Sequence, residues 1–144
     1  MKHIIIPLFL LIIALVSCEI ETSNNGKLDG NWQLQHIDTL ATNGTCDMTH
    51  SYIYWAVEND LLQVRDIDNQ NLKILFRFER QDGNLTLHSP HFVVTKDELI
   101  PLESDSLLQP LGIPDLRSTF LIESLTHSRM TLKGAQLRLH FRKY

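Results

Sequence analysis

The chain has 144 residues, 43% of them hydrophobic, and a formal net charge of −4 at neutral pH. Its length predicts one domain with one hydrophobic core. An acidic chain gains nothing electrostatically from nucleic acid or from anionic lipid headgroups, so neither is expected to bind it through charge.

An apolar run over residues 4–15 follows Lys2 and His3 and leads into Leu15-Val16-Ser17-Cys18. The run is too short to span a bilayer and has poor flanks for doing so. This stretch resembles the signal peptide of a bacterial lipoprotein. The resemblance implies that residues 1–17 are removed and that Cys18 receives a diacylglyceryl group on its thiol.

The mature chain that this resemblance implies has 127 residues and a formal charge of −5. The lipid on Cys18, rather than a basic patch, would then hold the protein to a membrane. Residues 18–27, which are rich in Ser, Asn and Gly, are expected to form a flexible tether. The implied location is the cell envelope, as an outer-membrane lipoprotein on the periplasmic face or the cell surface. Lipidation would leave Cys46 without a disulfide partner.

The predicted folded domain covers residues 28–144 and begins with a strand in which Trp32 and Leu34 alternate with glutamines. A run of aromatic and β-branched residues over 52–57 predicts a second strand. Residues 61–67 predict a third. Residues 72–80 show the strongest alternation, whose period of two is incompatible with a helix.

Asp82-Gly83 predicts a tight hairpin turn into a strand over residues 84–88. Ser89-Pro90 interrupts this strand, which is expected to continue over residues 91–94 as an edge or bent segment. Between Thr95 and Arg117 the alternation disappears, and three prolines break any long element. Only one helical turn, at residues 104–109, is expected there. Further strands are predicted over residues 119–125, 129–133 and 136–144.

Together these elements predict an all-β fold made of one antiparallel, up-and-down barrel of about eight strands with a single proline-interrupted excursion. Consecutive strands joined by tight turns favour a meander. With no second domain to cover its edges, such a sheet hides them most readily by closing on itself.

Three features resemble the lipocalin pattern: Gly30-x-Trp32 in the first strand, a meander of about eight strands, and an arginine in the last strand. The resemblance implies that Trp32 closes one end of the barrel and packs against Arg142, or against Arg138 if the register shifts. The ending of the chain also resembles uncharacterised lipocalin-like lipoproteins of Gram-negative envelopes. The leading expectation is a non-enzymatic protein that holds a small apolar or amphipathic ligand at one mouth of the barrel, because barrels of about eight strands are the size that can hold one small ligand.

Inward-facing positions of the predicted strands are either core residues or ligand-facing residues, and all are bulky. Bulky residues favour a barrel filled with its own side chains. The alternative function is therefore a structural or interaction lipoprotein, an accessory subunit of an envelope complex that recognises protein or glycan through the Thr95–Arg117 excursion. The principal inward positions are Leu34, Ile74, Phe76, Phe78, Leu87, Leu132, Leu139 and Phe141.

The sequence contains no nucleophile–base motif and no phosphate-binding loop, so neither catalysis nor a cofactor is expected. His88-Ser89-Pro90-His91 has a spacing found in metal sites, but the proline rules out a helix, and no metal is expected there. Asp38-Thr39-Leu40 and Asp105-Ser106-Leu107 resemble the acceptor of a Gram-negative O-glycosylation system. Whether either is glycosylated stays open.

Overall fold

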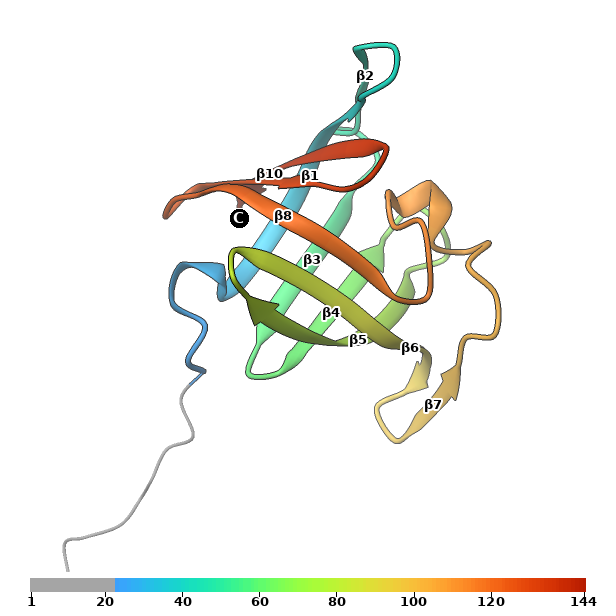
Figure 1. The fold of residues 1–144 in the computed structure, drawn as a ribbon. Coiled ribbons are helices and arrows are strands. Elements are labelled where there is room, and N and C mark those ends of the chain that lie inside the picture. The colour runs from blue at the N-terminus through green and yellow to red at the C-terminus, as the bar shows by residue number, and fades with distance from the viewer. Residues whose placement is uncertain (1–22) are drawn as a thin grey trace, which may run out of the picture.

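A computed structural model describes residues 23–144, which form an almost wholly β structure (Figure 1). The predicted signal peptide and Cys18 lie outside the described residues. No helix among residues 23–144 is long and apolar enough to cross a membrane. The strands are β1 (Gly30–Thr39), β2 (Gly44–Asp47), β3 (Ile53–Glu58), β4 (Leu61–Asp66), β5 (Leu72–Gln81), β6 (Asn84–Thr95), β7 (Glu98–Pro101), β8 (Ser118–Leu125), β9 (Arg129–Lys133) and β10 (Leu137–Lys143), and the 3-10 turns are η2 (Gly26–Leu28) and η3 (Gln109–Leu111).

The strands form a single antiparallel sheet that closes on itself. Its order is β10-β9-β8-β6-β5-β4-β3-β1, and β10 also pairs with β1, which completes a ring of eight strands. β2 extends from β1 and β7 from β6, both outside the ring (Figure 1). The predicted all-β barrel of about eight strands is confirmed. Closure leaves the ring without a free edge, which is the physical advantage of this architecture.

The predicted hairpin between β5 and β6 shows how local sequence sets the turns. Asp82 and Gly83 both have positive φ angles, of 53° and 79°. A two-residue turn of this hand matches the twist of antiparallel strands, and Asp-Gly accommodates it at low cost. Asn43, which ends the turn between β1 and β2, also has a positive φ, of 55°.

β6 continues through Pro90, where the sequence suggested an interruption. Its first half pairs with β8 and its second half with β7, and its register against β5 shifts between these halves. Ser89 has a φ of 53° at this point. Pro90 has no N–H to donate, so it fits where the ladder is already irregular. The bend was predicted, whereas strands β2 and β7 were not.

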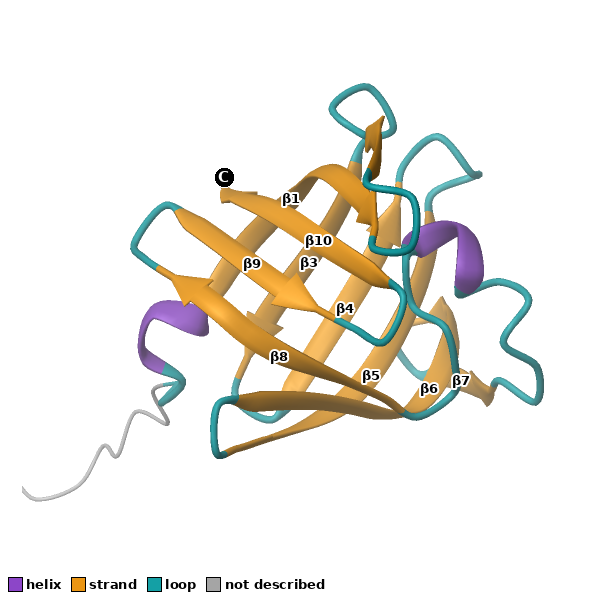
Figure 2. Ribbon diagram, turned by 45° about the horizontal axis from the view of Figure 1, so that its top comes forward, coloured by secondary structure: helices purple, strands orange, loops and turns teal. Residues whose placement is uncertain are grey.

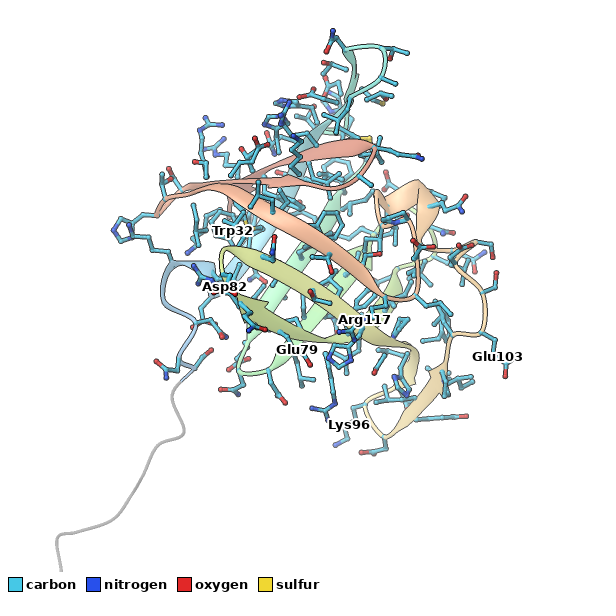
Figure 3. All side chains as sticks on the ribbon, viewed as in Figure 1. Trp32, Glu79, Asp82, Lys96, Glu103 and Arg117 are labelled. Carbon is cyan, nitrogen blue, oxygen red and sulfur yellow. The ribbon has the colours of Figure 1, made fainter. Side chains whose placement is uncertain are left out.

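The two ends of the barrel are closed by different segments, seen as the two helical turns on opposite sides of the molecule in Figure 2. η2 lies at the end where β1 begins. η3 lies at the other end, within residues 102–117, which we call the cap. In Figure 3, Trp32 lies toward the first end, and Glu103 and Arg117 of the cap lie toward the second.

Residues 23–27, assigned to the flexible tether on sequence grounds, are packed against the first end of the barrel. Asp29 accepts hydrogen bonds from the Ser23 hydroxyl and from both the backbone and the side-chain amide of Asn25. Asn25 also donates to the backbone oxygen of Asn59, at 2.6 Å. Burial raises the pKa of Asp29, but these hydrogen bonds outweigh it and hold the pKa below its ordinary value. Short polar side chains thus extend the fold toward the N-terminus.

Candidate functional site

The interior of the barrel is filled with large apolar side chains. Trp55, on β3, has no exposed surface and packs against Phe141 and Phe120, with ring centroids 4.7 Å and 6.1 Å away. This packing favours the filled barrel that bulky inward residues suggested. All the predicted inward positions are buried in one cluster: Leu34, Ile74, Phe76, Phe78, Leu87, Leu132, Leu139 and Phe141.

Trp32 closes the first end of the barrel. It is fully buried, and its indole N–H donates to the backbone oxygen of Leu28 at 2.9 Å. The Lys143 ammonium lies 4.7 Å from the centroid of the Trp32 ring and donates to the backbone oxygen of Lys27. Gly30 has a φ of 122°, and a Cβ there would lie 3.4 Å from Cε of Lys143. A Cβ at that distance would only touch the lysine stem, so the positive φ, rather than a lack of space, favours glycine here.

The cation over Trp32 is Lys143, not Arg142 as the family resemblance implied. Arg142 lies opposite Gln33 and is exposed, because side chains alternate along β10 and Phe141 already points inward. Arg138 shares the outward face and bonds to Glu123. Leu137, Leu139 and Phe141 point inward, and the same alternation places Lys143 on their face. The sequence could therefore have identified Lys143 as the cation beside Trp32.

The cap closes the second end of the barrel with apolar side chains. Leu108 and Ile113 have no exposed surface and Leu111 is 2% exposed, and all three belong to the core cluster. A Cβ on Gly112, whose φ is 83°, would lie 2.8 Å from Cδ2 of Leu139 and 3.4 Å from Cδ1 of Ile37. The cap backbone therefore lies directly on β1 and β10. The cap lies in the segment where prolines break the alternation, and the sequence did not reveal that its side chains enter the barrel.

The hydrogen bonds of the cap backbone are largely its own. The N–H groups of Leu108 and Gln109 donate to the Asp105 oxygen, and those of Leu111 and Ile113 donate to the Leu108 oxygen. The cap is thus attached to the barrel mainly by inserted side chains, whereas the strands are joined to one another by backbone hydrogen bonds. Apolar burial opposes its displacement by roughly 1.5–3 kcal/mol for each large side chain, and the Leu102 N–H bonded to the Pro90 oxygen and the Arg117–Glu79 ion pair add polar contacts to β6 and β5.

A hollow of about 340 Å³ lies between the cap and the β9–β10 turn. Its lining includes Gly112 and Pro114 of the cap, Phe120 of β8, and Gly134 of the turn. Asp105, Gln109 and Gln136 make part of it polar. An opening of this size with mixed lining is within the usual range of small-molecule sites.

The ring of Trp55 packs against Phe120, which lines the hollow, whereas Trp55 itself is paired with Trp32 across β3 and β1 and is not among the lining residues. Its indole N–H is buried and is the one buried side-chain polar atom without a hydrogen-bond partner among residues 23–144. Leaving such a group unpaired costs about 1–3 kcal/mol. The sequence placed Trp55 on a strand but gave no signal that its N–H would be unpaired.

These features define a small antiparallel barrel with one end closed by a tryptophan and a cation and the other by an inserted cap. The Lipocalin-like domain family matches residues 12–144, and the chain belongs to this family. No curated protein matches the chain.

Two solved structures share the fold. One is a lipocalin-like protein from Bacteroides uniformis, with a TM-score of 0.64 and 16% identity, which aligns over 83% of this chain and 100% of its own. The other is an uncharacterized protein from Bacteroides eggerthii, with a TM-score of 0.53 and 15% identity over 81% of this chain and 98% of its own. At these identities the similarity concerns the fold alone.

Proposed function

We propose that this protein is a non-enzymatic, lipid-anchored lipoprotein of the cell envelope that binds a small amphipathic molecule at the capped end of its barrel. Lipocalin-like folds commonly bind small hydrophobic ligands, and the chain belongs to that family. The observation that carries the proposal is the hollow beside the cap, whose lining residue Phe120 packs against Trp55, the residue with the unpaired, buried N–H.

Binding would require the cap to move, since the interior is already filled. A ligand that replaced Leu108, Leu111 and Ile113 would need about a dozen apolar carbon atoms to occupy the same space. An acceptor oxygen on the ligand would satisfy the Trp55 N–H and recover the cost of leaving it unpaired. These two requirements describe an amphipathic ligand with an apolar chain and a polar acceptor.

The proposal is tested by titrating the detergent-solubilised full chain with dansyl-labelled undecanoic acid and following the dansyl emission. We expect saturable binding, weakened by Trp55→Phe, which keeps the ring and removes the N–H. Trp32→Phe is the matched control, because the Trp32 N–H already donates to Leu28 and faces the other end. No saturable binding, or equal loss in both variants, would contradict a site at Trp55.

The alternative of an interaction lipoprotein with a filled barrel also has a specific observation in its favour. Val94, Leu99 and Ile100, on the β6–β7 hairpin outside the ring, are 46%, 44% and 48% exposed. Clustered exposed apolar residues mark contact sites for other proteins, and β7 pairs with β6 alone among the described strands. An extended segment of an envelope protein could add to this edge.

Crosslinking in intact cells distinguishes the two functions. A photoreactive residue in place of Leu99 should capture a protein if the hairpin is a contact site, and the same residue in place of Glu58 is the control on another exposed part of the barrel. Capture at Leu99 alone, without binding of the dansyl probe, would favour the interaction function.

A further inference from the structure

Three side chains of metal-ligating type come together on the outside of the barrel, where β1 meets β10. They are His36 and Asp38 of β1 and His140 of β10, and their ligand atoms all lie within 4.8 Å of one another. The two imidazole rings are stacked with centroids 4.0 Å apart. Nε2 of His140 lies 2.7 Å from Oδ2 of Asp38. More than 100 residues separate the histidines in sequence, so no spacing motif could reveal the group.

A β-bulge creates this arrangement. Leu34 lies opposite Phe141 and His36 opposite His140, so Gln35 is an extra residue on β1. Without the bulge, His36 would share the inward face of Leu34, because side chains alternate along a strand. The bulge turns His36 outward beside His140, and Ile37 turns inward in its place. Bulges that re-aim a side chain are common next to functional sites.

The surroundings hold these side chains in position. Thr45 of β2 donates its hydroxyl to Oδ1 of Asp38 at 2.9 Å, leaving Oδ2 directed at His140. The three side chains are partly buried, and His36 and His140 border a hollow of about 350 Å³ that is wide enough for several waters. In metal sites, neighbouring residues commonly hold the ligating side chains in position through hydrogen bonds, as Thr45 does for Asp38 beside the two partly buried imidazoles.

The charges around the group are compatible with a cation. Arg138 lies opposite Asp38, but its guanidinium is bound by Glu123. Asp47, opposite His36 on β2, and Arg129 of β9 also line the hollow. The lining of the hollow thus holds one carboxylate and one guanidinium, and the Asp38 carboxylate, bonded to His140, adds a second negative charge to the group.

We propose that His36, Asp38 and His140 bind one divalent transition-metal ion of the zinc class, with water completing its coordination. Two imidazoles and one carboxylate are a common three-residue set for such ions. Neighbouring ligand atoms in a tetrahedral zinc site lie roughly 3.3 Å apart, so binding opens the 2.7 Å contact between His140 and Asp38 slightly and brings together the ligand atoms that now lie within 4.8 Å of one another. An ion here would join the first and last strands of the ring.

The test is calorimetric titration of the chelator-treated, detergent-solubilised full chain with Zn²⁺ alone. We expect one ion per chain, and at least about a 10-fold loss of affinity in each of His36→Gln, His140→Gln and Asp38→Asn. The double variant His88→Gln/His91→Gln is the matched control, since it removes two partly buried histidines of β6, which does not pair with β1 or β10, and should leave the affinity unchanged.

A second measurement needs no variant. In NMR spectra of the unmutated protein, Zn²⁺ should shift the ring resonances of His36 and His140 and leave those of His88 and His91 in place. Absence of one-to-one binding overturns the proposal, as do an affinity unchanged in the His36 and His140 variants and resonance shifts confined to other histidines.

Discussion

Lys143 holds its ammonium 4.7 Å from the centroid of the Trp32 ring, so the last strand of the barrel covers the tryptophan of the first. The two residues are directly paired between β1 and β10. A cation over an indole contributes about 0.5–2 kcal/mol, depending on its desolvation. The pair of Trp32 and Lys143 thus takes part both in joining β1 to β10 and in covering this end of the barrel.

A double-mutant cycle tests this contact. Trp32→Ala should lower the free energy of unfolding by about 3–5 kcal/mol, because it leaves a large cavity. Lys143→Ala should cost about 0.5–2 kcal/mol. The double variant should lose less than the sum, measured by urea denaturation, since both changes remove one contact. Arg142→Ala, on the exposed face, should stay within about 0.5 kcal/mol. Additive losses would show that Lys143 does not stabilise the fold through the indole.

Two glycines with similar backbone angles test how closely the cap is packed. Gly83 and Gly112 have φ angles of 79° and 83°, but a Cβ on Gly83 meets nothing within 4 Å, whereas one on Gly112 would overlap Leu139. Gly83→Ala should cost about 1–2 kcal/mol from the left-handed backbone alone. Gly112→Ala should cost about 1–3 kcal/mol more, because it also overpacks the interface. Equal changes in thermal unfolding would mean that the cap readily moves away from β10.

His36 should make the stability depend on pH near neutrality. Its pKa in the folded protein lies below the ordinary value of about 6.5, so the unfolded chain binds more protons between these two values. Stability is therefore at its full value above about pH 6.5 and falls as the pH drops through the folded-state pKa. Denaturation at pH 7.5 and 5.5 should show a smaller difference for His36→Gln than for the unmutated protein.

His127→Gln, which changes an exposed histidine in the β8–β9 turn, is the control for this measurement. Carboxylates contribute in a separate range, because the pKa of Asp38 is lowered by its hydrogen bonds from His140 and Thr45 and its stabilisation is lost only in acid, below about pH 4. If His36→Gln leaves the difference between pH 7.5 and 5.5 unchanged, the His36 environment is not responsible for it.

Membrane attachment should depend on Cys18, the proposed lipidation site. Cys18→Ala should remain unlipidated and appear in the soluble fraction, since an acidic domain has no electrostatic attraction to anionic headgroups. Cell fractionation followed by a high-salt wash measures this, and Cys46→Ser is the control because Cys46 lies exposed on β2. Sedimentation of Cys18→Ala with membranes after the wash would refute the lipoprotein proposal.

Much of the fold could be predicted from local patterns. The alternation in β5 and β10 and the Asp82-Gly83 turn lead to antiparallel strands, because period-two burial and a left-handed turn are local properties. The cation beside Trp32 could also have been predicted. Alternation along the strand puts Lys143 on the same face as Leu139 and Phe141, and Arg142 on the opposite face.

Only the tertiary structure decided the features on which the proposals rest. Residues 102–117 carry no periodic pattern, and their leucines enter the barrel because its second end exposes an apolar rim that must be covered. The Gln35 bulge reverses the parity of β1, and ring closure then sets His36 and Asp38 beside His140. The Trp55 N–H is unpaired only because of its place in the packed interior. The sequence by itself determined which faces of the strands are apolar, whereas contacts between distant residues depend on how the closed ring and its cap pack.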